Sequence, residues 1–216
     1  FRGADFIGVG GTDDLDAYTG VFDGNHHTIS NVVLKSHTTH NALFRNIRSG
    51  AMIRNLDVYN ADTSGGTHSA TIASLVDQSY IINVHVKGSL TYGSSTNAAG
   101  GLANAMTNNS VVSHSSYEGA VRGNTSVGGL VSDIGANGNP GHVQKSKAYL
   151  SLFGFGSSVG GIVATGGINS TAEIRQNYST GDLTGSATRS GGILGRDGQI
   201  YESMSSMIIS VQTSES

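Results

Sequence analysis

The chain has 216 residues, of which 32 are glycine, one is proline and none is cysteine, and its formal net charge is −3 at pH 7. The lack of cysteine excludes a disulfide framework and cysteine-bound zinc, and the slight negative charge excludes the basic surface typical of nucleic-acid-binding proteins. The apolar runs are too short for a membrane-spanning helix, so we expect no membrane insertion.

A repeat organises most of the chain. An aliphatic residue is followed two positions later by a polar one, and the polar positions 83, 114, 145 and 176 follow one another at intervals of 31 residues. The aliphatic positions are Ile53, Ile81, Val112, Val143, Ile174 and Ile200. The polar positions are Asn55, Asn83, His114, Lys145, Gln176 and Glu202. A period of this size indicates units that stack on their neighbours.

Each repeat has the pattern of short β-strands. Leu56 and Val58 alternate with polar residues, Gly and Asn interrupt the runs, and no segment carries a helical apolar stripe. The sequence therefore predicts an all-β fold, a parallel β-solenoid of about six to seven coils with a period near 31 residues. We expect the polar position to point outward, and the residues one and three positions after it to point inward. These inward residues are Leu56, Val58, Val84, Val86, Ser115, Tyr117, Ser146, Ala148, Asn177, Ser179, Ser203 and Ser205.

Pairs of adjacent glycines recur in four successive repeats. They are Gly100–Gly101, Gly128–Gly129, Gly160–Gly161 and Gly191–Gly192. Stacked coils lie about 4.8 Å apart, so a position that lies against its own copy in the next coil, or that turns with positive φ, tolerates no Cβ. We therefore expect turns or tightly apposed backbone at these pairs. A single glycine also recurs at Gly88, Gly119 and Gly181, and Leu150 interrupts that series.

Three segments resemble the GLUG-motif repeats of bacterial surface proteins. They are YTGVFDGNHHTISNVVL at residues 18–34, VGGLVSDIG at 127–135 and SGGILGRDG at 190–198, although His26 and Ser132 stand where the family has glycine. The resemblance implies one solenoid domain over residues 1–216, with opening strands and a first coil at 1–40, repeats at 41–209 and a tail at 210–216. It also implies a setting in large secreted or surface-anchored bacterial proteins, which include adhesins and the non-catalytic regions of immunoglobulin A1 proteases.

Metal ligands are weighed against simpler structural roles. Asp13, Asp14 and Asp16 form the densest carboxylate cluster and could bind Ca²⁺, which prefers oxygen ligands, but we expect a solvated acidic loop. The histidines should be scattered over surface and turns, without a shared strand face for chelation. They are His26, His27, His37, His40, His68, His85, His114 and His142. We therefore predict no metal site and no cofactor.

Catalytic arrangements are few. The string Gly156–Gly160 matches GxSxG, but a nucleophile elbow needs a strand-to-helix turn, and here the string leads into a glycine pair. A β-helix that cleaves polysaccharides needs carboxylates on one outer face. The best pair is Asp133 and Asp197, which two coils would hold about 10 Å apart. We predict no catalytic residue and no enzymatic activity.

We expect a non-catalytic binding, adhesion or spacer module that presents loops from a rigid solenoid, in an extracellular or cell-surface protein. The partner would be a host or cell-surface glycan or protein, and we expect its site in the longest insert, residues 132–142. Outward Tyr59, Tyr149 and Tyr178 could contact sugars, but we place them on three separated coils and in two columns. Two alternatives stay open, a polysaccharide lyase or glycoside hydrolase on a β-helix, and a solenoid that self-assembles into fibres through its ends.

Overall fold

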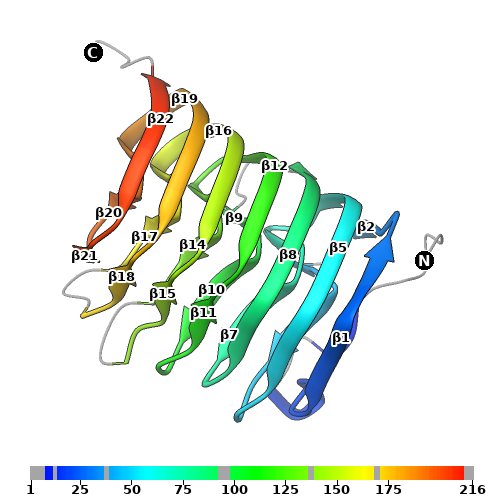
Figure 1. Ribbon diagram of the computed structural model, residues 1–216. Helices are drawn as coiled ribbons and strands as arrows, with labels where there is room; N and C mark the ends of the chain where they lie inside the picture. Colours follow the sequence, from blue (N-terminus) through cyan, green and yellow to red (C-terminus); the bar gives the residue numbers. More distant parts are fainter. Residues whose placement is uncertain are drawn as a thin grey trace.

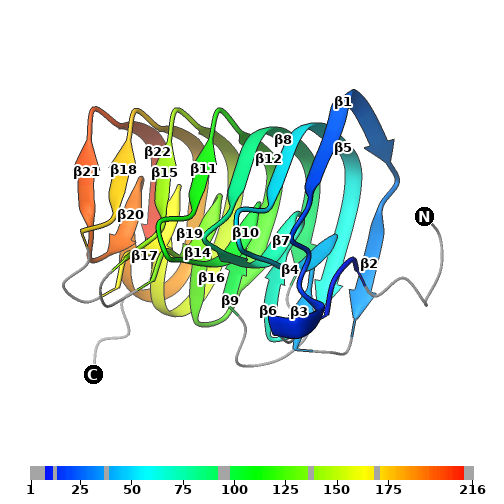
Figure 2. The same ribbon diagram turned by 90° about the horizontal axis from the view of Figure 1, so that it is seen from below.

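The computed structural model describes residues 8–11, 14–36, 39–91, 98–135, 139–167 and 171–211, and these form a parallel β-solenoid (Figure 1). Strands of successive coils lie side by side along one axis, with β1 (Val21–Ser30) and β22 (Met204–Val211) at opposite ends of the stack (Figures 1 and 2). The predicted fold class and the period near 31 residues are confirmed. About 5 turns are completed by the described residues, compared with the six to seven coils expected.

Equivalent strands of successive coils pair side by side and form sheets. The broad face of the solenoid is formed by β1 (Val21–Ser30), β5 (Met52–Gly65), β8 (Tyr80–Thr91), β12 (Ser116–Gly123), β16 (Lys147–Gly160), β19 (Tyr178–Gly191) and β22 (Met204–Val211). A six-stranded sheet is formed by β4 (Phe44–Ile47), β7 (Ala73–Asp77), β10 (Ala103–Thr107), β14 (Val131–Asp133), β17 (Val163–Thr165) and β20 (Leu194–Arg196). All strand pairs within these two sets are parallel.

Two sets of short strands complete the coils. The set that precedes the broad face pairs with the start of β8 and consists of β11 (Val111–Ser113), β15 (His142–Gln144), β18 (Glu173–Arg175) and β21 (Gln199–Tyr201). The set that follows it consists of β2 (Val33–Ser36), β3 (His40–Asn41), β6 (His68–Ala70), β9 (Ala98–Gly100) and β13 (Ser126–Gly128). The single described helix is the 3-10 turn η1 (Asp14–Asp16), and no described helix is long and apolar enough to cross a membrane.

The aliphatic positions of the repeat stack into one buried file, as predicted. Val112 lies in register with Ile81 on one side and with Val143 on the other, and both neighbours are fully buried. The file continues to Ile200, which is 47% exposed because no described strand lies beyond its coil. Burial of these side chains from water is the main favourable contribution of the narrow core.

The polar positions are left-handed corners, a conformation that the sequence did not predict. They point outward as expected, since His114, Lys145, Gln176 and Glu202 are exposed and Asn55 and Asn83 are partly exposed. Each has a positive φ. In the later coils the corner separates the short strand from the broad-face strand, whereas Asn55 and Asn83 lie within β5 and β8. The values are 50° at Asn55, 55° at Asn83, 50° at His114, 50° at Lys145, 56° at Gln176 and 47° at Glu202. Asn83 Nδ2 donates a hydrogen bond to Asn55 Oδ1 at 2.9 Å, so neighbouring corners are also joined by their side chains. Asparagine tolerates this conformation better than most residues.

The predicted inward residues are buried from Leu56 to Ser179. Ser203 is partly buried and Ser205 is exposed, because β22 is the last described strand of the broad face. The polar members form a hydrogen-bonded file inside the coils. Ser146 Oγ accepts a hydrogen bond from the backbone N–H of Ser115 at 3.2 Å and donates one to the carbonyl of Gln144 at 2.8 Å. Buried polar side chains are tolerated there because they satisfy backbone groups of the corner.

Large and small inward side chains exchange places between neighbouring coils. Tyr117 lies in register with Ala148, and Gly119 lies in register with Leu150. The large members of these two pairs fill equivalent space, since the Tyr117 ring packs beside Gly101 and the Leu150 side chain beside Gly129. The space that Tyr117 fills in one coil is filled in the next by Leu150, which lies two residues after Ala148, the partner of Tyr117. The core volume is thereby conserved, which explains why Leu150 interrupts the single-glycine series.

The glycine pairs are close contacts between coils. None of these described glycines has a positive φ, so the expected alternative of a left-handed turn does not apply. A Cβ on Gly101 would collide with the carbonyl oxygen of Gly129, and a Cβ on Gly129 would collide with the carbonyl oxygen of Gly161. The predicted tight apposition of backbone is therefore confirmed.

Replacing Gly129 with alanine is expected to lower the free energy of unfolding by at least about 2 kcal/mol, because the new Cβ would meet rigid backbone. The matched control is Gly20→Ala, whose Cβ would meet the hydroxyl of Tyr18 at 3.0 Å, at the free end of a rotatable side chain. Urea unfolding followed by circular dichroism measures both variants. Equal stabilities of the two variants would contradict the proposed contact.

Candidate functional site

The outward side chains of the broad face form two straight rows, because successive strands pair in register. The first row is Thr28, Asp57, His85, Ser116, Lys147, Tyr178 and Met204. The second row is Ser30, Tyr59, Lys87, Glu118, Tyr149, Thr180 and Ser206. Residues about one repeat apart in the sequence therefore become neighbours along the solenoid axis.

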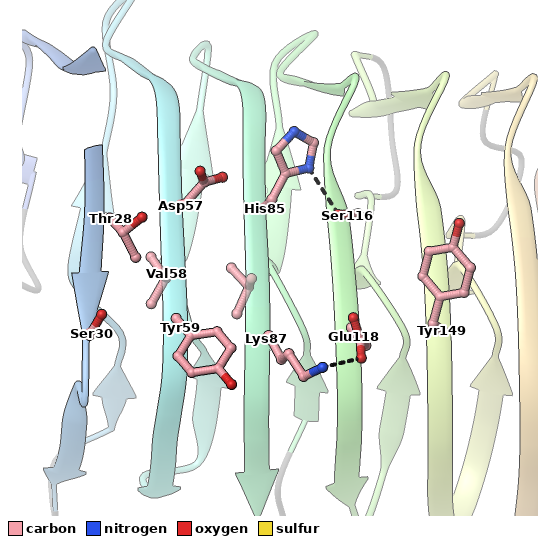
Figure 3. A pocket seen from close by; sticks show the side chains of 11 residues that line it. Thr28, Ser30, Asp57, Val58, Tyr59, His85, Lys87, Ser116, Glu118 and Tyr149 are labelled. Atoms are coloured by element: carbon pink, nitrogen blue, oxygen red, sulfur yellow. Dashed lines mark hydrogen bonds and ion pairs between the residues drawn. The ribbon is translucent and has the colours of Figure 1, made fainter. Parts of the chain in front are cut away.

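A shallow depression follows these rows across the broad face (Figure 3). Its main part has a volume of about 580 Å³ and includes Tyr59, Lys87, Glu118 and Tyr149 in its lining. Two smaller hollows, of about 490 Å³ and 230 Å³, each share Glu118 with the main part. We call the three together the axial depression, because they cross the strands in the direction of the solenoid axis.

An ion pair lies at the centre of the axial depression. Lys87 Nζ donates to Glu118 Oε1 at 2.5 Å, and the two side chains are 52% and 53% exposed. The hydrogen bond to Glu118 raises the pKa of Lys87 above its usual value. In the first row the Nδ1 atom of His85 and the Oγ atom of Ser116 lie 2.9 Å apart. An exposed ion pair adds little to stability. This one places a donor and an acceptor side by side at the centre of the depression.

The structure brings together tyrosines that the sequence analysis separated. Tyr59 and Tyr149 belong to the same row and are 54% and 40% exposed. Tyr149 and Tyr178 come from adjacent strands, and their ring centroids lie 6.3 Å apart in an edge-to-face arrangement. The prediction of two columns is correct, but the prediction of three separated coils is wrong. Two of the three rings touch because the interval between them is close to one repeat.

The suggested carboxylate pair does not form. Asp133 lies in register with Thr165, which in turn lies in register with Arg196, so Asp197 is one residue out of the file. The Nε atom of Arg196 donates to the Asp197 carboxylate at 2.7 Å. Asp133 accepts a hydrogen bond from the backbone N–H of Gly135 at 2.7 Å, and burial raises its pKa. Both aspartates therefore have local structural partners.

The remaining candidates are dispersed or lie outside the described residues. Asp13 and His37 are outside them, so the solvated acidic loop stays a prediction. No three His, Cys, Asp or Glu side chains gather within the described part of the chain. His40 and His68, which were expected to be scattered, lie in adjacent coils with their ring centroids 5.3 Å apart and the rings tilted by 31°. Ser158 of the GxSxG string is buried within β16.

The insert at residues 132–142 is described only at its two ends, because residues 136–138 are outside the described residues. At those ends the backbone N–H of Gly141 donates to the carbonyl of Ile134 at 2.7 Å, and Pro140 is buried. A partner site in this insert therefore stays a prediction.

Known proteins share the fold of this chain. No family model matches it, so membership of the GLUG-motif family stays a prediction. Halomucin from Haloquadratum walsbyi is 33% identical over 106 residues, which are 49% of this chain and 1% of halomucin. The crystal structure of a "putative immunoglobulin A1 protease" from Bacteroides ovatus has a TM-score of 0.76 at 21% identity, covering 96% of this chain and 66% of that one. At this identity the match shows the shared fold alone.

Asp133→Asn is expected to become more stable than the natural protein as the pH rises above 3.8, the ordinary pKa of the group. Burial raises the pKa in the folded state, so the folded protein binds the proton more tightly and loses stability as the carboxyl ionises. Asparagine stays neutral and keeps an oxygen for the Gly135 N–H.

Thermal melts over a pH series measure the effect, with Asp197→Asn as the control because that carboxylate is paired with Arg196 at the surface. Parallel pH profiles for the natural protein and Asp133→Asn would show that burial of this carboxyl has no energetic consequence.

Proposed function

We propose that the chain is a non-catalytic binding module of a large extracellular or cell-surface protein, and that the axial depression is its binding site. The carrying observation is the register of the broad face, which holds Tyr59, Lys87, Glu118 and Tyr149 in one exposed row. The matches support the setting, since the chain aligns with 1% of the long protein halomucin and shares its fold with a protein named as a protease of immunoglobulin A1.

Rigid spacing favours the broad face over the insert as the binding site. Each central strand is hydrogen-bonded on both sides, so the ladder fixes the spacing of the backbone positions from which its outward side chains project. Lys87 and Glu118 are in addition hydrogen-bonded to each other. Side chains held in advance lose less conformational entropy on binding than side chains on a loop.

The enzymatic alternative has less support from the geometry. The axial depression contains two carboxylates, Asp57 and Glu118, in different rows and two strands apart. Two strand spacings already amount to about 10 Å, and the offset between rows adds to it, which exceeds the separation that glycoside hydrolysis requires. Glu118 is in addition bonded to Lys87.

The binding proposal is tested with a variant that removes both charges of the central pair, Lys87→Ala/Glu118→Ala. We expect saturable binding of the fluorescently labelled protein to cultured epithelial cells or whole bacterial cells, and a loss of at least about tenfold in affinity for this variant. Flow cytometry measures both.

The matched control is Lys35→Ala/Asp62→Ala, which removes an equally exposed ion pair outside the axial depression. It should bind like the natural protein. Absence of saturable binding to either cell type, or equal loss in the two variants, would overturn the proposal.

Self-association is a second candidate function, and the exposed C-terminal coil favours it. Ile209 continues the buried file of Leu183 but is 45% exposed, and Ile208 is 67% exposed. Within the described residues β22 pairs only with β19, so its outer edge is unpaired. An unpaired edge beside apolar side chains favours addition of another strand, and we propose a second copy of the chain as the occupant.

Light scattering over a concentration series tests this second candidate. The natural protein is expected to grow in mass with concentration, whereas Ile209→Lys is expected to stay monomeric, because a charge would enter the contact. A thermal melt checks that the variant is folded. A natural protein that stays monomeric at every concentration would overturn the candidate.

A further inference from the structure

The two exposed tyrosines of the second row indicate what the axial depression accepts. Figure 3 shows Tyr59 and Tyr149 on either side of the Lys87–Glu118 pair, with their rings lying over the sheet. Three strand spacings separate them, or about 14 Å along the solenoid axis. Aromatic faces offer large apolar surfaces on rigid side chains, and such surfaces stack on the C–H faces of sugar rings. The spacing suits an extended chain of several sugar units.

The groups between the tyrosines suit hydroxyl groups. Lys87 has three donor hydrogens and the Glu118 carboxylate has about four acceptor positions, and one hydrogen bond joins them. Their remaining capacity faces solvent, because each side chain is about half exposed. A sugar hydroxyl both donates and accepts, so adjacent hydroxyls can bond to both members of the pair.

The charge balance disfavours an anionic ligand. The positive charge of Lys87 is compensated by Glu118 at 2.5 Å, and Asp57 contributes a further carboxylate to the lining. A sulfated or phosphorylated polymer would need uncompensated Lys or Arg side chains. The lining therefore disfavours an anionic polymer and is compatible with an uncharged ligand, whose hydroxyls can bond to the ion pair.

The backbone beneath the depression disfavours an added peptide strand. β8 pairs with β5 and β12, and β12 pairs with β8 and β16, so these strands have no free edge for a peptide to extend. Recognition must use side chains on the face of the sheet. The direction of the depression across successive strands then aligns an elongated ligand with the solenoid axis.

We infer that the axial depression binds an uncharged linear oligosaccharide along the solenoid axis, with Tyr59 and Tyr149 stacking on two of its sugar rings and Lys87 and Glu118 bonding to hydroxyls between them. The inference rests on the proposed function and adds the class of ligand.

Isothermal titration calorimetry tests it with cello-, xylo-, manno- and laminari-oligosaccharides, each from disaccharide to octasaccharide. Affinity in at least one series should rise until the chain spans about 14 Å and should then level off, because both rings are by then occupied. Tyr59→Ala and Tyr149→Ala should each weaken binding about tenfold, and the double variant should weaken it further.

The control variant is Tyr80→Ala, because Tyr80 is 36% exposed but does not line the depression. It should change the affinity by less than about twofold, which is well below the tenfold loss expected when a stacking tyrosine is removed. Heparin and polygalacturonate serve as charged probes and should not bind more tightly than the uncharged series.

Two results would overturn the inference, namely no binding in any uncharged series, or binding that survives in Tyr59→Ala/Tyr149→Ala. If cell binding is nevertheless lost in Lys87→Ala/Glu118→Ala, the ligand class is wrong and the binding face stands. If the protein binds neither cells nor oligosaccharides, the proposed function fails as well.

Discussion

Direct contact between the backbones of successive coils is the constraint on which the solenoid depends. At Gly129 the backbone N–H donates to the carbonyl of Gly160 at 3.0 Å, and the position has no room for a Cβ. This contact sets the distance from one coil to the next. The six-stranded sheet and the broad face therefore have the same strand spacing, since both are built from the same coils. Fixed spacing in turn allows Ser115, Ser146 and Asn177 to reach the backbone of the neighbouring coil.

Because the spacing between coils is constant, residues one repeat apart in the sequence become neighbours on the outer surface. Side chains that point outward cannot influence the register, because the ladder and the inward files determine it. Tyr59, Lys87, Glu118 and Tyr149 come from four strands, and nothing local in the sequence connects them. Their alignment results from stacking, and the axial depression exists because stacking repeats one outward position several times.

The features that can be predicted from the sequence are those that require the same kind of buried side chain in every coil. Ile81, Val112 and Val143 are recognisable as a file because the same kind of side chain returns at a constant interval. The left-handed corners escaped prediction because different residue types occupy them, and His114 or Lys145 gives no sign of a positive φ. Asparagine at two of the corners was the only available signal.

The candidate site was harder to predict than the fold. Asp133 follows Gly129 by four residues, whereas Asp197 follows Gly192 by five, and this difference of one residue places Asp197 outside the file of Asp133. The two positions look equivalent only when they are not counted from the glycine pairs. The row that contains Tyr59 and Tyr149 was within reach, because both lie four residues after a polar corner position. The row becomes visible when the position of each outward side chain is counted from the corner that precedes it.

The direction of the hydrogen bonds has a mechanical consequence. In a parallel solenoid the bonds between coils run along the axis, so tension applied through the two ends of the stack pulls on them lengthwise. Among the described strands β1 pairs only with β5 and β22 only with β19, so a tensile load would detach these two strands before those paired on both sides. Under flow or shear such a stack would lengthen by shedding one coil at a time, and each released coil would limit the force transmitted to the next.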